Sequence, residues 1–169
     1  MNRYKIRNIA LNGIMLAVII ALQAINLPNL LTGIIVNAIL VFVYLEVGIK
    51  SAIILCILSP FCGFITGHVP VIMYPVLPMI ALGNSLMLIS LSKLENKSIW
   101  LKLFIPSLIK AFIIGIGGFL LIYYFIPDKI GNYLMFSVLG IQFFTAISGI
   151  ALGLKISKNK AINENNIIS

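Results

Sequence analysis

The sequence predicts an all-α membrane protein, a six-transmembrane-helix bundle with both termini in the cytoplasm. Composition is the first reason: mean hydropathy is +1.13, and 61% of the 169 residues are hydrophobic while 9% are charged. So few polar groups cannot cover the surface of a soluble domain. The second reason is a series of six apolar runs, each near the roughly 20 residues that cross a bilayer. They lie at 9–27, 30–47, 51–66, 71–91, 103–126 and 133–154.

The distribution of positive charge is the third reason and sets the orientation. Of twelve basic residues, Lys110 lies within a span and Lys129 lies outside, which leaves ten in segments on the cytoplasmic side. Short loops rich in lysine and arginine stay inside, so the N-in, C-in topology follows. The net charge of +8 is then explained by loops that face anionic lipid, because no basic face with interleaved aromatics indicates nucleic acid. The ten residues are Arg3, Lys5, Arg7, Lys50, Lys93, Lys97, Lys102, Lys155, Lys158 and Lys160.

The chain divides into one membrane domain, residues 1–155, and a cytoplasmic tail, residues 156–169. The tail is rich in Asn and Lys and is expected to be disordered. The first span does not end in a small-residue cleavage site, so it is interpreted as a retained helix rather than a signal peptide. Cys56 and Cys62 have the spacing of neither a metal site nor a disulfide framework.

Small residues form a stripe along the first span. Gly13, Ala17 and Ala21 recur every four residues and therefore share one face of a helix. Such a face lets another helix approach closely. Two interpretations stay open from spacing alone: packing against a helix of the same bundle, or docking of a separate subunit.

The second and third spans contain the first polar and irregular features. Asn37 lies deep in the second span, and Glu46 at its end is expected to pair with Lys50 one turn later. Pro60 interrupts the third span, because proline removes a backbone donor and bends a helix.

The connection after the third span is the most irregular stretch of the sequence. Pro70, Pro75 and Pro78 fall within nine residues, close to His68, the only histidine. Irregular backbone at membrane depth persists only where protein or a water-filled cavity satisfies its polar groups. The sequence therefore predicts a polar-lined cavity on the outer side.

Lys110 in the fifth span is costly at membrane depth and has three interpretations. It contacts a ligand, it reaches back to the cytoplasmic interface, or it is a structural partner for Asn84 or Glu46. Further out, the aromatic residues that end this span and Tyr133 are typical of an interfacial belt, or of faces that stack on a planar ligand.

The candidate ligand site combines polar and aromatic residues expected on the outer side. Small-molecule pockets are mostly apolar, with a few convergent polar groups. Binding is expected to depend on Tyr74, His68 and Gln142 more than on the deeper Lys110 and Asn84. The full candidate set is Asn26, His68, Tyr74, Asn132, Tyr133 and Gln142.

Nothing in the sequence indicates an enzyme. The four carboxylates lie on separate segments and there is one histidine, so neither paired-acid catalysis nor a metal site is expected. No phosphate-binding loop or nucleotide motif is present, so any energy for transport would come from other subunits. No cofactor is expected.

These features together resemble the substrate-binding (S) component of energy-coupling factor (ECF) transporters, over essentially the whole bundle. The stripe Gly13-x3-Ala17-x3-Ala21 is similar to the alanine motif of that family, with glycine in place of the first alanine. Further matches resemble a less-characterised, clostridial-type group of S components. They are Gly33-x3-Asn37-Ala38, Leu58-Ser59-Pro60, Pro75-x2-Pro78-Met79 and Leu82-Gly83-Asn84.

The resemblance implies a membrane-embedded capture subunit of an ABC-type importer in the bacterial plasma membrane. It implies that the stripe docks onto a transmembrane coupling subunit, that two ATPase subunits supply the energy, and that an outward-facing cavity binds a vitamin or other micronutrient. Signature residues for thiamine, riboflavin, biotin or folate are missing, so the ligand stays open. The sparse outer charge argues against a polyanion.

The alternative is a structural or assembly subunit of a larger membrane complex that binds no ligand. In that case the stripe and the glycines of the fifth span, Gly115, Gly117 and Gly118, are permanent interfaces.

Overall fold

A computed structural model describes residues 3–125 and 131–168, and every regular element in these ranges is helical. This confirms the all-α prediction. The α-helices are α1 (Arg3–Ala24), α2 (Asn29–Val47), α3 (Ile49–Ile65), α4 (Leu77–Lys93), α5 (Ile99–Phe125) and α6 (Gly131–Ile168). A 3-10 helix, η1 (Val71–Val76), leads into α4 and contains Pro75.

Five helices in the described part are long and apolar enough to cross a membrane, and the remaining α-helix, α3, is shorter. With 17 residues, α3 extends for about 25 Å at 1.5 Å per residue, less than the hydrocarbon thickness. Glycines with positive φ bound it, Gly48 at 114° and Gly67 at 76°. The fold is compatible with a multi-pass membrane protein.

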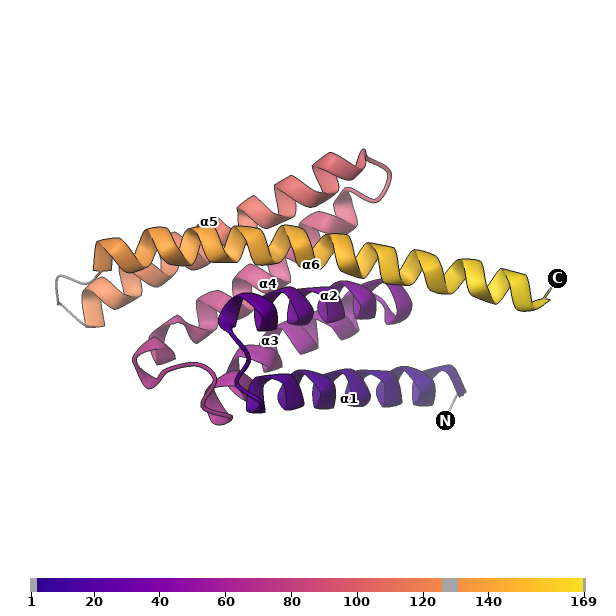
Figure 1. Cartoon of the computed structure of the whole chain (residues 1–169), viewed down its shortest axis with the longest axis horizontal. Helices are drawn as coiled ribbons and strands as arrows, with labels where there is room; N and C mark the ends of the chain where they lie inside the picture. The colour runs from indigo at the N-terminus through magenta and orange to yellow at the C-terminus, as the bar shows by residue number, and fades with distance from the viewer. Residues whose placement is uncertain (1–2, 126–130, 169) are drawn as a thin grey trace.

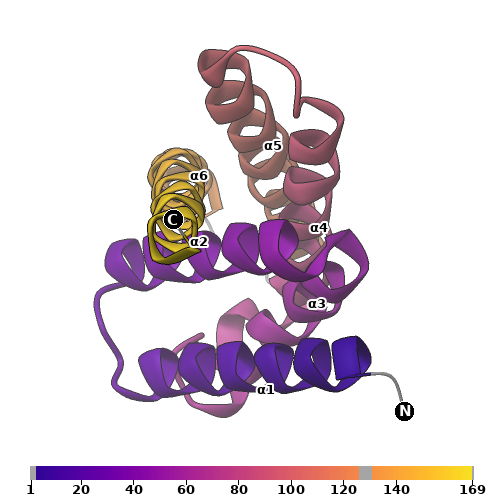
Figure 2. The same ribbon diagram turned by 90° about the vertical axis from the view of Figure 1, so that its right-hand side faces the viewer.

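Successive helices run in opposite directions, so alternate connections meet at the same end of the bundle (Figure 1). One end carries the start of α1, the α2–α3 and α4–α5 connections, and the second half of α6. The cationic segments described above are these same segments, and we call this the basic end. In the view from that end, α2 lies between α1 and α6 (Figure 2).

Helix α2 is the centre of the core. It packs against α1, α3, α4 and α6, and most of its inward residues are fully buried. The buried cluster around it draws residues from five helices, including Ile19, Leu40, Leu55, Met87 and Ile150.

Glycines allow α6 to approach the backbone of α2. A Cβ on Gly149 would lie 2.8 Å from the carbonyl oxygen of Ile34 and would also overlap the Cβ of Asn37. One turn later, a Cβ on Gly153 would lie 2.9 Å from the carbonyl oxygen of Ala38. This G-x-x-x-G pair therefore makes a backbone-to-backbone contact that no other residue permits.

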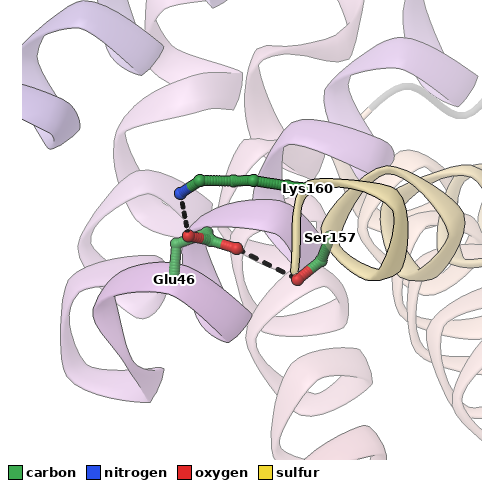
Figure 3. Close-up of polar contacts among 3 residues, drawn as sticks. All are labelled: Glu46, Ser157 and Lys160. Atoms are coloured by element: carbon green, nitrogen blue, oxygen red, sulfur yellow. Dashed lines mark hydrogen bonds and ion pairs between the residues drawn. The ribbon is translucent and has the colours of Figure 1, made fainter. Parts of the chain in front are cut away.

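Glu46, at the end of α2, binds α6 rather than α3 (Figure 3). Its carboxylate accepts hydrogen bonds from Ser157 Oγ, at 3.0 Å, and from Lys160 Nζ. The expected pair with Lys50 is wrong, because the chain breaks at Gly48 and Lys50 is not on the next turn of the same helix.

The tail expected to be disordered is helical in the structure, because α6 continues through Ile168. After Gly153 the sequence contains no glycine or proline that would end the helix. The contacts of Glu46 with Ser157 and Lys160 also fix the first turns beyond residue 155.

The small-residue face of α1 points away from the bundle. Ala17 and Ala21 are exposed, and a Cβ on Gly13 would meet nothing within 4 Å. The opposite face of α1 packs against α2 and α3 through buried Ile19 and Gln23. Of the two interpretations of the stripe, packing inside the same bundle is therefore not what the structure has.

The α2–α6 contact gives a first prediction. Gly149→Ala should lower the thermal stability of the detergent-purified protein, by about 1–3 kcal/mol, because its Cβ meets backbone that cannot move aside. A thiol-reactive dye that reports exposure of buried Cys56 measures the transition. Gly140→Ala on the same helix is the control, since its Cβ would meet nothing within 4 Å. Equal melting temperatures for the two variants would contradict the close contact.

Candidate functional site

A cavity of about 220 Å³ lies inside the bundle, in the half away from the basic end. All six α-helices and the α3–α4 connection contribute to its wall. Among its lining residues, Asn29 at the start of α2 and Pro70 in the α3–α4 connection are exposed. The lining residues are Gln23, Asn29, Thr32, Gly33, Val36, Asn37, Ser59, Pro60, His68, Val69, Pro70, Met73, Val76, Ile80, Asn84, Lys110, Ile114, Val138, Ile141, Gln142 and Thr145.

The buried floor of the cavity is polar. Asn37, Asn84 and Lys110 come from α2, α4 and α5, and their exposed fractions are 1%, 3% and 4%. Lys110 Nζ donates a hydrogen bond to Asn37 Oδ1 at 2.6 Å. Lys110 therefore does not reach back to the interface, and its partner is neither of the two residues expected, Asn84 and Glu46.

Glycine next to the floor brings two of its helices together. A Cβ on Gly83 would lie 2.7 Å from Ile114 Cγ1 and 3.4 Å from the carbonyl oxygen of Lys110. Helix α4 thus packs closely on α5 one residue before Asn84. This contact places the Asn84 amide and the Lys110 ammonium on the same cavity wall.

The hydrogen-bond partners of Asn37 and Gln23 determine how their side-chain amides are oriented. Because an ammonium only donates, Asn37 must turn its oxygen to Lys110, which leaves Nδ2 as a free donor. Gln23 Nε2 donates to the Ser59 carbonyl oxygen at 3.1 Å, which leaves Oε1 as a free acceptor. Gly63 makes room for this amide, since a Cβ there would lie 3.0 Å from Gln23 Nε2.

Unsatisfied polar atoms are concentrated at this site. In residues 3–125 and 131–168, four buried side-chain atoms have no hydrogen-bond partner, and three of them belong to lining residues. These are Gln23 Oε1, Asn37 Nδ2 and Asn84 Oδ1. Buried polar groups are normally paired, so three such atoms around one cavity indicate groups that a bound molecule or water satisfies.

Charge at the site is unbalanced. Within the part of the chain that the structure describes, the lining residues contain one lysine and no aspartate or glutamate. Glu46 and Glu95 lie at the basic end, where Glu46 binds Ser157 and Lys160 and Glu95 accepts a hydrogen bond from the Tyr44 hydroxyl. The cavity therefore holds an excess positive charge wherever Lys110 is protonated.

His68 forms part of the rim. Its Nδ1 lies 3.1 Å from Asn26 Oδ1, so the two side chains share a hydrogen bond that positions the imidazole ring. Partial burial lowers the pKa of His68 below its ordinary value, so the ring is neutral at pH 7. Asn26 reaches this position with a positive φ of 59°, which asparagine tolerates better than most residues.

The structure places the candidate set at several positions. His68 and Gln142 line the cavity, and Asn26 positions His68 from the α1–α2 turn. Tyr74 is 60% exposed, packs on Phe64 with ring centroids 5.3 Å apart, and does not line the cavity. Asn132 and Tyr133 lie in α6, but their side chains are outside the described part.

Sequence reasoning missed the role of the floor. It treated Lys110 and Asn84 as a separate, deeper region, whereas one cavity contains both together with His68 and Gln142. The available signal was three polar residues at similar depth in three spans, Asn37, Asn84 and Lys110. Gln23 carried no such signal, because its role depends on the turn of α1 toward α3.

The side chains at this site can form hydrogen bonds with a small molecule. No group of three His, Cys, Asp or Glu side chains that could hold a metal occurs among the described residues. The lining instead offers an ammonium, amide donors and acceptors, one neutral imidazole and branched apolar walls. Such a set orients a small molecule through hydrogen bonds and charge.

Comparison with known proteins adds no family to this geometry. No family model matches the sequence, and no curated protein or solved structure is significantly similar to it. Function is therefore inferred from the cavity, the distribution of charge and the sequence motifs.

Proposed function

We propose that this protein is the substrate-capture (S) subunit of an ECF-type importer in the bacterial plasma membrane, and that it takes up a vitamin or other micronutrient. One observation carries the proposal: a cavity inside the helix bundle, with buried polar atoms that lack partners, away from the basic end. A ligand supplies the missing partners, and the apolar walls supply the remaining affinity.

The proposed topology has six spans with both termini in the cytoplasm. The basic end then faces the cytoplasm, as the positive-inside rule requires, and the cavity opens to the outside. Helix α3 is counted as a span in this topology, in addition to the five longer helices, and it packs against α1, α2 and α4. A short span is accommodated by local thinning of the bilayer, at a modest free-energy cost.

The proposed partners are a transmembrane coupling subunit and two ATPase subunits. The exposed face of Gly13, Ala17 and Ala21 is the proposed docking surface, because close helix contact in a membrane depends on small residues. The chain has no nucleotide-binding motif, so ATP hydrolysis is assigned to the partners. No cofactor is proposed.

A structural or assembly subunit without a ligand is the alternative. It explains the exposed stripe equally well, but it gives no reason for unpartnered buried polar atoms around a cavity. The cavity therefore favours capture of a small molecule.

Labelling tests the topology. In a chain with both native cysteines replaced by alanine, Val71→Cys should react with an impermeant thiol reagent added to whole cells. Asn96→Cys in the α4–α5 connection should react only after permeabilisation. Both positions are exposed, so accessibility within the protein is matched. The reverse pattern would overturn the orientation.

Purification tests capture. Protein extracted from native membranes should carry a small molecule that denaturation releases and mass spectrometry detects. Val138→Trp fills the cavity and should abolish retention, whereas Leu152→Trp on the exposed side of the same helix should not. If the wild-type protein retains nothing that the Val138 variant loses, the structural subunit is the better assignment.

Substitution of the stripe tests docking. Ala17→Leu and Ala21→Leu add bulk where helices must approach closely, so co-purification of the coupling subunit should fall by at least about tenfold, a loss of roughly 1.4 kcal/mol. Retention of the small molecule should persist. Ala151→Leu makes the same change on an exposed face of α6 and should leave assembly intact. Normal assembly of both stripe variants would remove α1 as the docking surface.

A further inference from the structure

Lys110 is a buried lysine whose only hydrogen-bond partner in the described part of the chain is a neutral amide. An ammonium has three N–H donors, and Asn37 Oδ1 accepts one of them. A lysine at membrane depth is strongly disfavoured unless an anion or water stabilises its charge. The described lining residues include no carboxylate, so none of them balances the charge of a protonated Lys110, whereas an anion that enters the cavity does.

A second donor points to the same place. Asn37 Nδ2 is fully buried and unpartnered, and it belongs to the side chain that holds Lys110. The ammonium and this amide N–H together form a two-donor site. Two donors from adjacent groups match the two oxygens of a carboxylate.

We infer that the cavity binds a small monocarboxylate, with its carboxylate held by Lys110 Nζ and Asn37 Nδ2. The inference rests on the proposed function, because it names the class of molecule that the capture site takes. Asn37 has two roles here: its oxygen positions Lys110, and its nitrogen contacts the ligand.

The charge and size of the site restrict the ligand further. Lys110 is the only cationic side chain among the described lining residues, so one negative charge is balanced and a second is not. A volume of about 220 Å³ corresponds to roughly seven water molecules at about 30 Å³ each. The acid is therefore small.

The remaining lining describes the rest of the molecule. Val36, Val76, Ile80, Ile114 and Val138 form apolar walls, which favour a hydrocarbon or aromatic body. Gln23 Oε1 and Asn84 Oδ1 are acceptors without donors, and they suit an N–H or O–H group on that body.

Matched acids and amides test the inference on the full chain purified in detergent and dialysed free of small molecules. The probes are benzoate with benzamide, and 3-methylbutanoate with 3-methylbutanamide, each titrated by thermal stabilisation. Each amide retains the shape of its acid but lacks the charge. We expect at least one acid to bind about 10- to 150-fold more tightly than its amide, the value of a charge-assisted hydrogen bond. Inorganic phosphate should not compete.

Variants of Lys110 assign the preference to its ammonium group. Lys110→Met removes the charge at nearly constant length, and Lys110→Gln also keeps a hydrogen bond to Asn37 in reach. Both should bind acid and amide equally. Lys102→Met, on the same helix but outside the cavity, should retain the preference for the acid. If the Lys110 variants fail to fold, the wild-type comparison still decides.

The outcomes separate this inference from the proposed function. Acids that bind no better than their amides overturn the anion site, as does a preference that survives in a folded Lys110→Met protein. Competition by phosphate overturns the restriction to a monocarboxylate. A neutral molecule released from native protein overturns the anion site too, but leaves capture intact. If neither acids nor amides bind and nothing co-purifies, both proposals fail.

Discussion

The contact between α2 and α6 is the constraint on which the rest of the site depends. At Gly149 the backbone of α6 lies against Ile34 and against the Cβ of Asn37. The Cβ of Asn37 is therefore held against α6, while its amide oxygen accepts a hydrogen bond from Lys110. A looser helix pair would let Asn37 turn, and the ammonium would lose the one neutral group that positions it. Close packing of the two helices at glycine thus positions a polar side chain in the adjacent cavity.

A charged side chain has different partners at the basic end of the bundle and in the cavity. At the basic end, Glu46 joins the end of α2 to Ser157 and Lys160, so this carboxylate is paired within the protein. In the cavity, the only hydrogen-bond partner of Lys110 among the described residues is the side-chain amide of Asn37. The pairing of Glu46 ties the same two helices that Gly149 and Gly153 hold together. The α2–α6 unit is therefore fixed at its polar end as well as along its apolar length, and the cavity lies beside a rigid wall.

Hydropathy predicted the helices because it depends on local sequence. The apolar runs and the irregular segment around Pro70 appear close to the expected positions. What failed depends on contacts between distant residues. Glu46 pairs with Lys160, 114 positions away, and Lys110 with Asn37, 73 positions away. The helical extension past residue 155 has the same origin, since Glu46 fixes its first turns. His68 and Gln142 were predicted as site residues only because both were expected on the outer side of the membrane, and both line the cavity. Tyr74 was expected on the same side, but its ring packs on Phe64 and does not line the cavity.

The arrangement of the floor also explains how an empty site tolerates a buried cation. Asn37 gives Lys110 one fixed hydrogen bond, and water in the cavity is able to solvate the remaining N–H groups. A ligand must replace that water, so a neutral molecule loses solvation of the ammonium and returns only a weak dipole. An anion returns a full charge in surroundings of low dielectric constant, where the Coulomb term is larger than in water. In the proposed carboxylate site, selectivity then arises from the cost of leaving a protonated Lys110 without a partner, because a molecule that cannot satisfy a buried polar group binds weakly. Burial of the lysine charge is unfavourable in a membrane span, and the same unfavourable burial disfavours ligands that cannot balance that charge.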